Sequence, residues 1–172
     1  MKKRNIWISI AIIAAAVAVF CFYMRQEGYI KIDTPGIELQ LRGGWFNRAM
    51  ITSGTEPVKI SARTYRPERL RISGEQDGNR WQIDSFGPWE KLAKIKVKND
   101  ETTVLKLGPP FLTRPRVDQR GSRVLIGLSI TGQAGEHYSA GVMKNGRRQP
   151  APKLKIVDEA GKILASGKFE YG

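Results

Sequence analysis

This chain of 172 residues contains one cysteine and one histidine, and that scarcity excludes several kinds of site. Cys21 has no second cysteine with which to form a disulfide. A zinc site built around His137 would need carboxylates for all its other ligands. A serine nucleophile would depend on the same histidine, and neither Gly-x-Ser-x-Gly nor Ser-x-x-Lys occurs in the sequence. The sequence therefore predicts no metal, no cofactor and no catalytic residue, and His137 is expected to be structural or incidental.

Long apolar runs are also scarce, since only the stretch from Ile6 to Tyr23 is free of charge over a long distance. Eighteen helical residues would extend about 27 Å, close to the thickness of the hydrocarbon core of a bilayer. The basic residues at positions 2–4 precede this stretch and favour a cytoplasmic N-terminus. We therefore predict a cytoplasmic tail (residues 1–5), a single-pass transmembrane anchor (residues 6–24) and a C-terminal domain outside the cytoplasm, at the cell membrane.

Two other interpretations of the N-terminal stretch remain open. A signal peptidase could cleave after the small residues 14–16 or 16–18, although this would leave the apolar segment 19–23 as the new terminus. Cys21 could be acylated as in a lipoprotein, although Phe20 before it is larger than the residue that this processing expects. Both points favour a retained anchor.

After the anchor, apolar and polar residues alternate with a period of two, which predicts β-strands with one buried face. The pairs Asp77-Gly78 and Asn145-Gly146 and the segment 159–161 predict tight turns between strands. The proline-rich stretch 107–115 suggests a boundary between a β-module at 28–107 and a second at 108–172, which could also share a sheet or a core. We predict an all-β fold of one or two small β-sandwich modules. The clearest alternating runs are 29–33, 37–42, 58–62, 70–72, 92–98, 124–130 and 154–157.

Part of the first module resembles a known family. The segments 28–44, 57–60, 65–67 and 97–104 together resemble the PEGA-type β-module, with Thr34-Pro-Gly-Ile37 in place of the tetrapeptide that names the family. Residues 108–172 loosely resemble immunoglobulin-like or carboxypeptidase-regulatory-like sandwiches. These resemblances imply small exported or membrane-tethered sandwiches with binding or structural roles, and they bring no catalytic residues.

Positive charge is the second strong feature of the sequence. Residues 26–172 carry 25 basic against 16 acidic side chains, a net charge of +9. Many of these basic residues alternate with apolar residues and are expected to face solvent, where they would bind anionic surfaces or, as the alternative, only keep strand edges soluble. The candidate binding residues are Arg42, Trp45, Arg48, Arg63, Tyr65, Arg66, Arg69, Arg71, Lys94, Lys96 and Lys98.

Two segments of the sequence resemble enzymatic or metal-binding sites. Asp84 and Glu90 flank the aromatic residues of segment 81–89, and such a carboxylate pair could serve a carbohydrate-active enzyme. The segment 75–79 is similar to part of a calcium loop but is better explained as a hairpin tip.

Taken together, the sequence predicts a non-enzymatic binding or scaffold module at the cell envelope. The expected partners are the membrane itself, and an anionic cell-wall polymer, lipid headgroups or a membrane protein. Nucleic acid is not expected, because the predicted compartment lies outside the cytoplasm. Two alternatives are the carbohydrate-active enzyme described above and an accessory subunit of a membrane complex, whose anchor would pack through its alanines.

Overall fold

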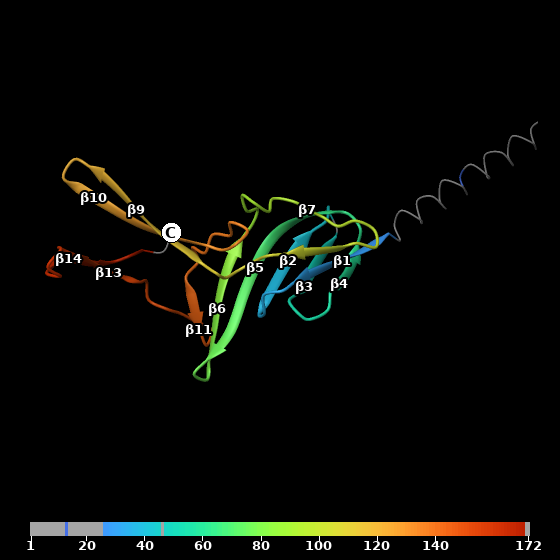
Figure 1. Cartoon of the computed structure of the whole chain (residues 1–172), viewed down its shortest axis with the longest axis horizontal. Helices are drawn as coiled ribbons and strands as arrows, with labels where there is room; N and C mark the ends of the chain where they lie inside the picture. The colour runs from blue at the N-terminus through green and yellow to red at the C-terminus, as the bar shows by residue number, and fades with distance from the viewer. Residues whose placement is uncertain (1–12, 14–25, 46, 171–172) are drawn as a thin grey trace, which may run out of the picture.

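The computed structural model describes residue 13, residues 26–45 and residues 47–170, and the described residues from 26 onward form an all-β protein (Figure 1). The alternating runs in the sequence appear as strands, with one exception: only two residues of the run 92–98 belong to a strand. The strands are β1 (Glu27–Ile32), β2 (Ile37–Arg42), β3 (Arg48–Thr52), β4 (Val58–Ser61), β5 (Thr64–Gln76), β6 (Asn79–Phe86), β7 (Ile95–Lys96), β8 (Thr102–Leu105), β9 (Leu112–Arg120), β10 (Arg123–Thr131), β11 (Val142–Lys144), β12 (Arg147–Arg148), β13 (Lys153–Val157) and β14 (Ile163–Lys168).

The predicted cytoplasmic tail (1–5) and membrane anchor (6–24) lie outside the described residues, except for Ile13. Within the described part of the chain, no helix combines the length and the apolar character needed to cross a membrane. The anchor therefore stays a prediction from the sequence.

The largest sheet has seven strands in the order β12-β11-β6-β5-β2-β3, with β7 paired to one end of β5. Strand β2 shows why this sheet has two different faces: Ile37, Leu39 and Leu41 are buried, and the residues between them are more exposed. This is the period of two that a half-buried strand requires. We call the face opposite the core the outer face of the large sheet.

A smaller sheet pairs β1 with β4 in antiparallel and with β8 in parallel orientation. Its buried residues Ile30, Ile32 and Leu105 belong to the same hydrophobic core as Leu39 and Leu70 of the large sheet. Burial of each such side chain contributes about 1.5–3 kcal/mol relative to exposure. This shared core fixes the position of the large sheet and leaves its outer face to solvent.

The predicted turns are confirmed. Asp77 and Asn145 have positive φ angles of 52° and 50°, and the glycines that follow them also have positive φ, as a type I′ hairpin turn requires. The two turns also contact each other: the Arg80 backbone N–H donates a 2.8 Å hydrogen bond to Asn145 Oδ1. This contact joins the start of β6 to the β11–β12 hairpin.

The predicted boundary at residues 107 and 108 does not interrupt the large sheet. Val142 of β11 pairs with Ile83 of β6, so the chain after residue 108 supplies two strands to the sheet of the first module. The fully buried Glu136 reinforces this connection, because its carboxylate accepts hydrogen bonds from the backbone N–H groups of Gly108 (2.6 Å) and Ala134 (2.8 Å). Of the arrangements that the sequence left open, a shared sheet is the one observed.

Two hairpins extend from this body at the end opposite to β1 (Figure 1). One is formed by β9 and β10 and the other by β13 and β14, and each is a separate two-stranded sheet. Their strands contain no buried residue, in contrast to the central strands β1, β2 and β5 of the body.

Candidate functional site

The outer face of the large sheet gathers five of the predicted basic residues on three strands. Arg42 lies directly opposite Arg48 of β3 on one side and Arg66 of β5 on the other. Arg69 and Arg71 follow on β5, opposite the outward residues of β2. Directly opposed residues share a face of the sheet. We call the set Arg42, Arg48, Arg66, Arg69 and Arg71 the arginine face.

Arg48, Arg42 and Arg66 form a row that runs across β3, β2 and β5. Neighbouring strands are about 4.8 Å apart, so the row places three cations along about 10 Å. Like charges in directly opposed positions destabilise a sheet. The row is therefore a position where additional negative charge would stabilise the protein.

A bulge in β5 supplies part of that negative charge. The register between β2 and β5 shifts at this point, with Leu41 opposite Pro67 and Gln40 opposite Arg69, so Glu68 is the extra residue. Its carboxylate is 3.5 Å from Arg42 Nη1 and 3.7 Å from Arg48 Nε. One carboxylate shared by two guanidinium groups leaves a net positive charge, and the Arg66 side chain has no ion-pair or hydrogen-bond partner within the described part of the chain.

A shallow hollow of about 260 Å³ lies beside this row, between β2, β3 and the bulge. Its walls carry both charged and apolar groups, which suits an anionic group attached to a less polar body. The lining residues are Gln40, Leu41, Arg48, Ala49, Met50 and Glu68.

Asp84 of β6 is held between the other two arginines of the face. Arg69 Nη2 is 2.6 Å from Asp84 Oδ2, and Arg71 Nε is 3.0 Å from Asp84 Oδ1. Burial alone would raise the pKa of the Asp84 carboxyl, but the hydrogen bonds and charges of the two guanidinium groups outweigh it and lower that pKa below its ordinary value. Asp84 is thus ionised at neutral pH, and this cluster also keeps one positive charge in excess.

The side chain of Phe86 completes this cluster. The ring is 60% exposed, and the Arg69 guanidinium carbon lies 5.7 Å from its centroid. The buried Nε of Arg69 has no hydrogen-bond partner among the described residues. Counting Glu38, Glu68 and Asp84 against the five arginines leaves a net charge of +2 on this face.

The remaining predicted residues lie elsewhere, and one of them requires a correction. Tyr65 is only 3% exposed and belongs to the core, where burial raises its pKa and its hydroxyl donates to the Ser61 carbonyl at 3.0 Å. Alternation alone could not predict that the Tyr65 side chain is buried, because Tyr65 lies before the bulge, where it faces the core side of β5.

Five further residues of the predicted set are outside the arginine face. Lys96 is paired to the start of β5, and Lys98 forms a 3.0 Å ion pair with Glu101. Trp45 is 91% exposed in the turn that joins β2 to β3, next to the end of the arginine row. The backbone brings Arg63 next to the lysine segment, because the Val97 N–H donates to the Arg63 carbonyl at 2.9 Å. These five residues are Arg63, Trp45, Lys94, Lys96 and Lys98.

The aromatic segment 81–89 does not present one surface. Trp89 is buried, and its indole N–H donates to Ser85 Oγ at 2.9 Å, whereas Phe86 lies on the outer face. Trp81 lies under the Lys144 ammonium, 5.1 Å from the ring centroid. A lowered pKa also makes Asp84 a poor general acid. The geometry therefore gives the carbohydrate-active alternative no additional support.

The segment that contains His137 has a structural feature that the sequence did not reveal. His137 is exposed, and its neighbour Glu136 is the buried group that fixes the loop at residue 108. The charge of Glu136 and burial together raise the pKa of Tyr138, with burial the larger cause. Among the described residues, no group of three or more histidine, cysteine, aspartate or glutamate side chains could hold a metal ion.

Sequence reasoning missed Glu68 and the hollow beside the arginine row, and it considered Phe86 only as part of the aromatic segment 81–89. The run of arginines from 63 to 71 was visible, but the bulge that turns Glu68 toward Arg42 depends on pairing with β2. The geometry that results is a cationic face with two shared carboxylates and one exposed ring. Comparison of the chain with protein-family models, with curated proteins and with solved structures found no match.

Proposed function

We propose that this chain is a non-enzymatic binding module, a β-sandwich domain held at the outer side of the cell membrane by the N-terminal anchor, which binds anionic polymers or lipid headgroups through the arginine face. The observation that carries the proposal is the row of Arg48, Arg42 and Arg66. Three cations at strand spacing are matched by one carboxylate only, that of Glu68. Phosphate or carboxylate groups repeated along a polymer would supply the missing charge, and guanidinium groups bind both in bidentate geometry.

Two further features support this function. The exposed Phe86 ring beside Arg69 offers a flat apolar surface next to a cation, which suits a ligand with anionic and less polar parts. The Asp84 and Glu68 carboxylates hold four of the five guanidinium groups in fixed positions. Fixed side chains lose less conformational entropy when a ligand binds.

The test uses the full chain in nanodiscs of neutral phosphatidylcholine. These particles are mixed with cell-wall material, with anionic vesicles and with neutral vesicles, and the bound fraction is measured by co-sedimentation from low to high salt. Capture that fades between about 0.1 M and 1 M salt, where the Debye length falls from about 10 Å to about 3 Å, is expected. Capture by the wall material or by the anionic vesicles identifies the source of the anion.

Arg66→Glu is the decisive variant, because Arg66 has no partner in the described part of the chain and its replacement breaks no ion pair. We expect its affinity for the captured surface to fall about fivefold, since a surface charge pair contributes about 1 kcal/mol. Lys94→Glu makes the same change in net charge at an exposed position outside the arginine face. Equal losses in both variants would show that net charge, and not this face, determines binding.

A further inference from the structure

The β9–β10 hairpin has two chemically different faces, and its register defines them. Val124 lies opposite Gln119, Ile126 opposite Val117, and Leu128 opposite Pro115. Opposed residues share a face, so these apolar side chains lie together. Val117 is 66% exposed and Val124 is 53% exposed. We call Pro115, Val117, Val124, Ile126 and Leu128 the apolar face of the hairpin.

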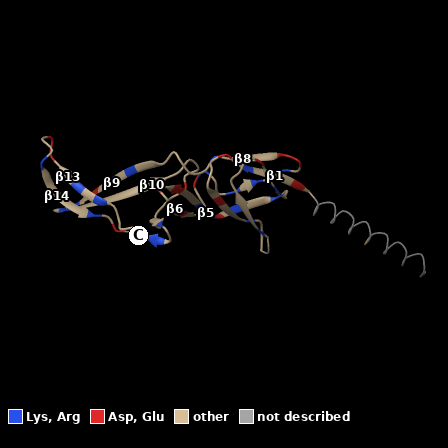
Figure 2. Cartoon of the chain, turned by 90° about the horizontal axis from the view of Figure 1, so that it is seen from below, with Lys and Arg blue, Asp and Glu red and all other residues tan. Residues whose placement is uncertain are grey.

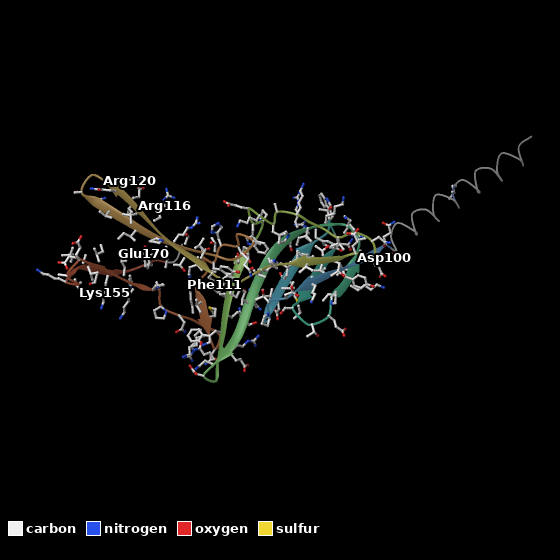
Figure 3. The ribbon with its side chains drawn as sticks, in the orientation of Figure 1. Asp100, Phe111, Arg116, Arg120, Lys155 and Glu170 are labelled. Atoms are coloured by element: carbon white, nitrogen blue, oxygen red, sulfur yellow. The ribbon has the colours of Figure 1, made fainter. Side chains whose placement is uncertain are left out.

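The opposite face carries most of the charge of the hairpin. Arg123 lies opposite Arg120, and Arg114 and Arg116 alternate in phase with Arg120 along β9. Figure 3 labels Arg116 and Arg120 on this hairpin, and Figure 2 shows basic residues along both hairpins. Arg120 forms a 3.3 Å ion pair with Asp118, whereas the other three arginines have no carboxylate partner in the described part of the chain.

The hairpin is incomplete as a sheet. In the described part of the chain, neither β9 nor β10 pairs with a third strand, although each contains nine residues. Only the end of β10 has a further backbone partner, because the Tyr138 N–H donates a 3.0 Å hydrogen bond to the Ile130 carbonyl. An isolated two-stranded hairpin is at best marginally stable in water, and an exposed contiguous apolar surface commonly marks an interaction site. A third strand would add backbone hydrogen bonds and cover both faces partially.

The two free edges of this hairpin differ. Strand β9 contains Pro115 at its centre, and a proline has no N–H with which to pair a neighbour. Strand β10, from Arg123 to Thr131, contains no proline. The edge of β10 from Arg123 to Ser129 is therefore the one that can accept an added strand. Beyond Ser129 this edge is already paired, because Thr131 forms a bridge with His137.

We infer that the edge of β10 binds an extended segment of a partner protein in which apolar residues alternate with acidic ones. Such a segment would add as a third strand, with its apolar side chains beside Val124, Ile126 and Leu128. Its carboxylates would lie beside Arg123 and would face Arg116 and Arg114 of β9 across Gly127 and Ser129 of β10. Backbone pairing supplies affinity and the alternation supplies specificity, as in other cases of strand addition. This inference concerns a different surface from the arginine face and does not depend on its function.

A second copy of this chain fits the surface less well. Stacked through their apolar faces, two hairpins of nine pairs would bury about 300 Å² each, because strands rise about 3.4 Å per residue and lie about 4.8 Å apart. The total of about 600 Å² is half of what a stable interface usually needs. Pairing the two β10 edges would bring together hairpins that each carry four arginines and one aspartate. An acidic strand meets neither difficulty.

The probe is a fluorescent nine-residue peptide of alternating isoleucine and glutamate, titrated against the full chain in neutral nanodiscs and followed by anisotropy. Saturable binding is expected. A peptide of the same composition, with its isoleucines and glutamates in two blocks, should bind at least about fivefold more weakly, because its charges no longer all lie on one face of a strand. Two further peptides are N-methylated at alternate residues, so that each lacks the N–H groups along one edge of the strand. They separate backbone pairing from charge, and at least one of them should lose binding.

Arg123→Glu should weaken binding of the alternating peptide about fivefold, the usual effect of an exposed charge pair. Lys162→Glu, in the turn between β13 and β14, is the matched control and should not change it. Circular dichroism of both variants checks that the strands persist. Equal binding by the alternating, block and N-methylated peptides would overturn the inference. It would also be overturned if the peptide did not bind and the apolar face instead formed a concentration-dependent dimer or was required for capture by anionic vesicles.

Discussion

Asp84→Asn offers the sharpest test of how the arginine face is built, because it should lower stability and raise anion affinity together. The substitution keeps the size of the side chain and removes its charge. In the folded protein the Asp84 carboxylate, only 16% exposed, accepts bonds from Arg69 at 2.6 Å and Arg71 at 3.0 Å. The variant therefore leaves two guanidinium groups on this face without a counter-charge.

The expected loss of stability follows from these two bonds. A hydrogen bond to a charged group contributes about 1.5–3 kcal/mol, and the asparagine keeps one acceptor, so the free energy of unfolding should fall by about 2 kcal/mol. For a domain of this size that corresponds to a decrease in Tm of about 4–8 °C. Urea denaturation followed by tryptophan fluorescence measures it. Affinity for the anionic surface should rise, because the charge of the face increases by one.

The pH dependence gives a second readout. The pKa of Asp84 in the folded protein is lowered from its ordinary value of 3.8. Its contribution to stability is therefore fully present above that ordinary value and is lost as the pH falls through the folded pKa. The parent protein and Asp84→Asn should differ most near neutral pH and converge in acid.

Two results would refute this reasoning. Unchanged stability at neutral pH would mean that the two ion pairs contribute nothing measurable. Weaker anion binding by a correctly folded variant would mean that the position of Arg69 and Arg71, and not their excess charge, determines affinity. Asp118→Asn is the matched control, because the Arg120–Asp118 pair on β9 is exposed and its removal should cost less than about 1 kcal/mol.

Two other substitutions test the connections between parts of the fold. Glu136→Gln places an amide group among backbone N–H donors at Gly108 and Ala134. The free energy of unfolding should therefore fall by about 2–4 kcal/mol, as measured by urea denaturation. A change below about 0.5 kcal/mol would contradict the role of Glu136 in fixing the loop at residue 108. Asn145→Ala removes both a side chain that tolerates positive φ and the acceptor for the Arg80 N–H, and should cost about 1–2 kcal/mol in the same assay, whereas Asn145→Gly should recover part of that loss because glycine restores the backbone conformation.

The strands and turns of this protein were largely predictable, because each depends on residues close together in the chain. The alternation in Ile37–Arg42 identifies β2 and its buried side, and Asp77-Gly78 identifies the turn before β6. The segment 92–98 shows the limit of such patterns. It alternates as well as β2 does, but only Ile95 and Lys96 pair with β5. Strand formation there depended on whether a partner strand was available.

The candidate site was predictable in composition and not in arrangement. Outward arginines on β2, β3 and β5 followed from the period of two, and five of the predicted residues do share one face. Tyr65 also fits the pattern of aromatic residues beside arginines, yet it is buried. The bulge at Glu68 reverses the alternation of inward and outward residues along β5, and no local sequence pattern predicts this bulge.

By itself, the sequence determined that the domain is all-β, strongly basic and built without disulfides after residue 25, because propensity, periodicity and charge are properties of each segment alone. Only the tertiary structure decided which arginines are neighbours, which carboxylates they share and which strand edge stays open. Those features depend on the register between strands far apart in the chain, as when Arg42 meets Arg66. Register is set by how the whole core packs, since a shift of one residue would turn Leu39 and Leu41 outward.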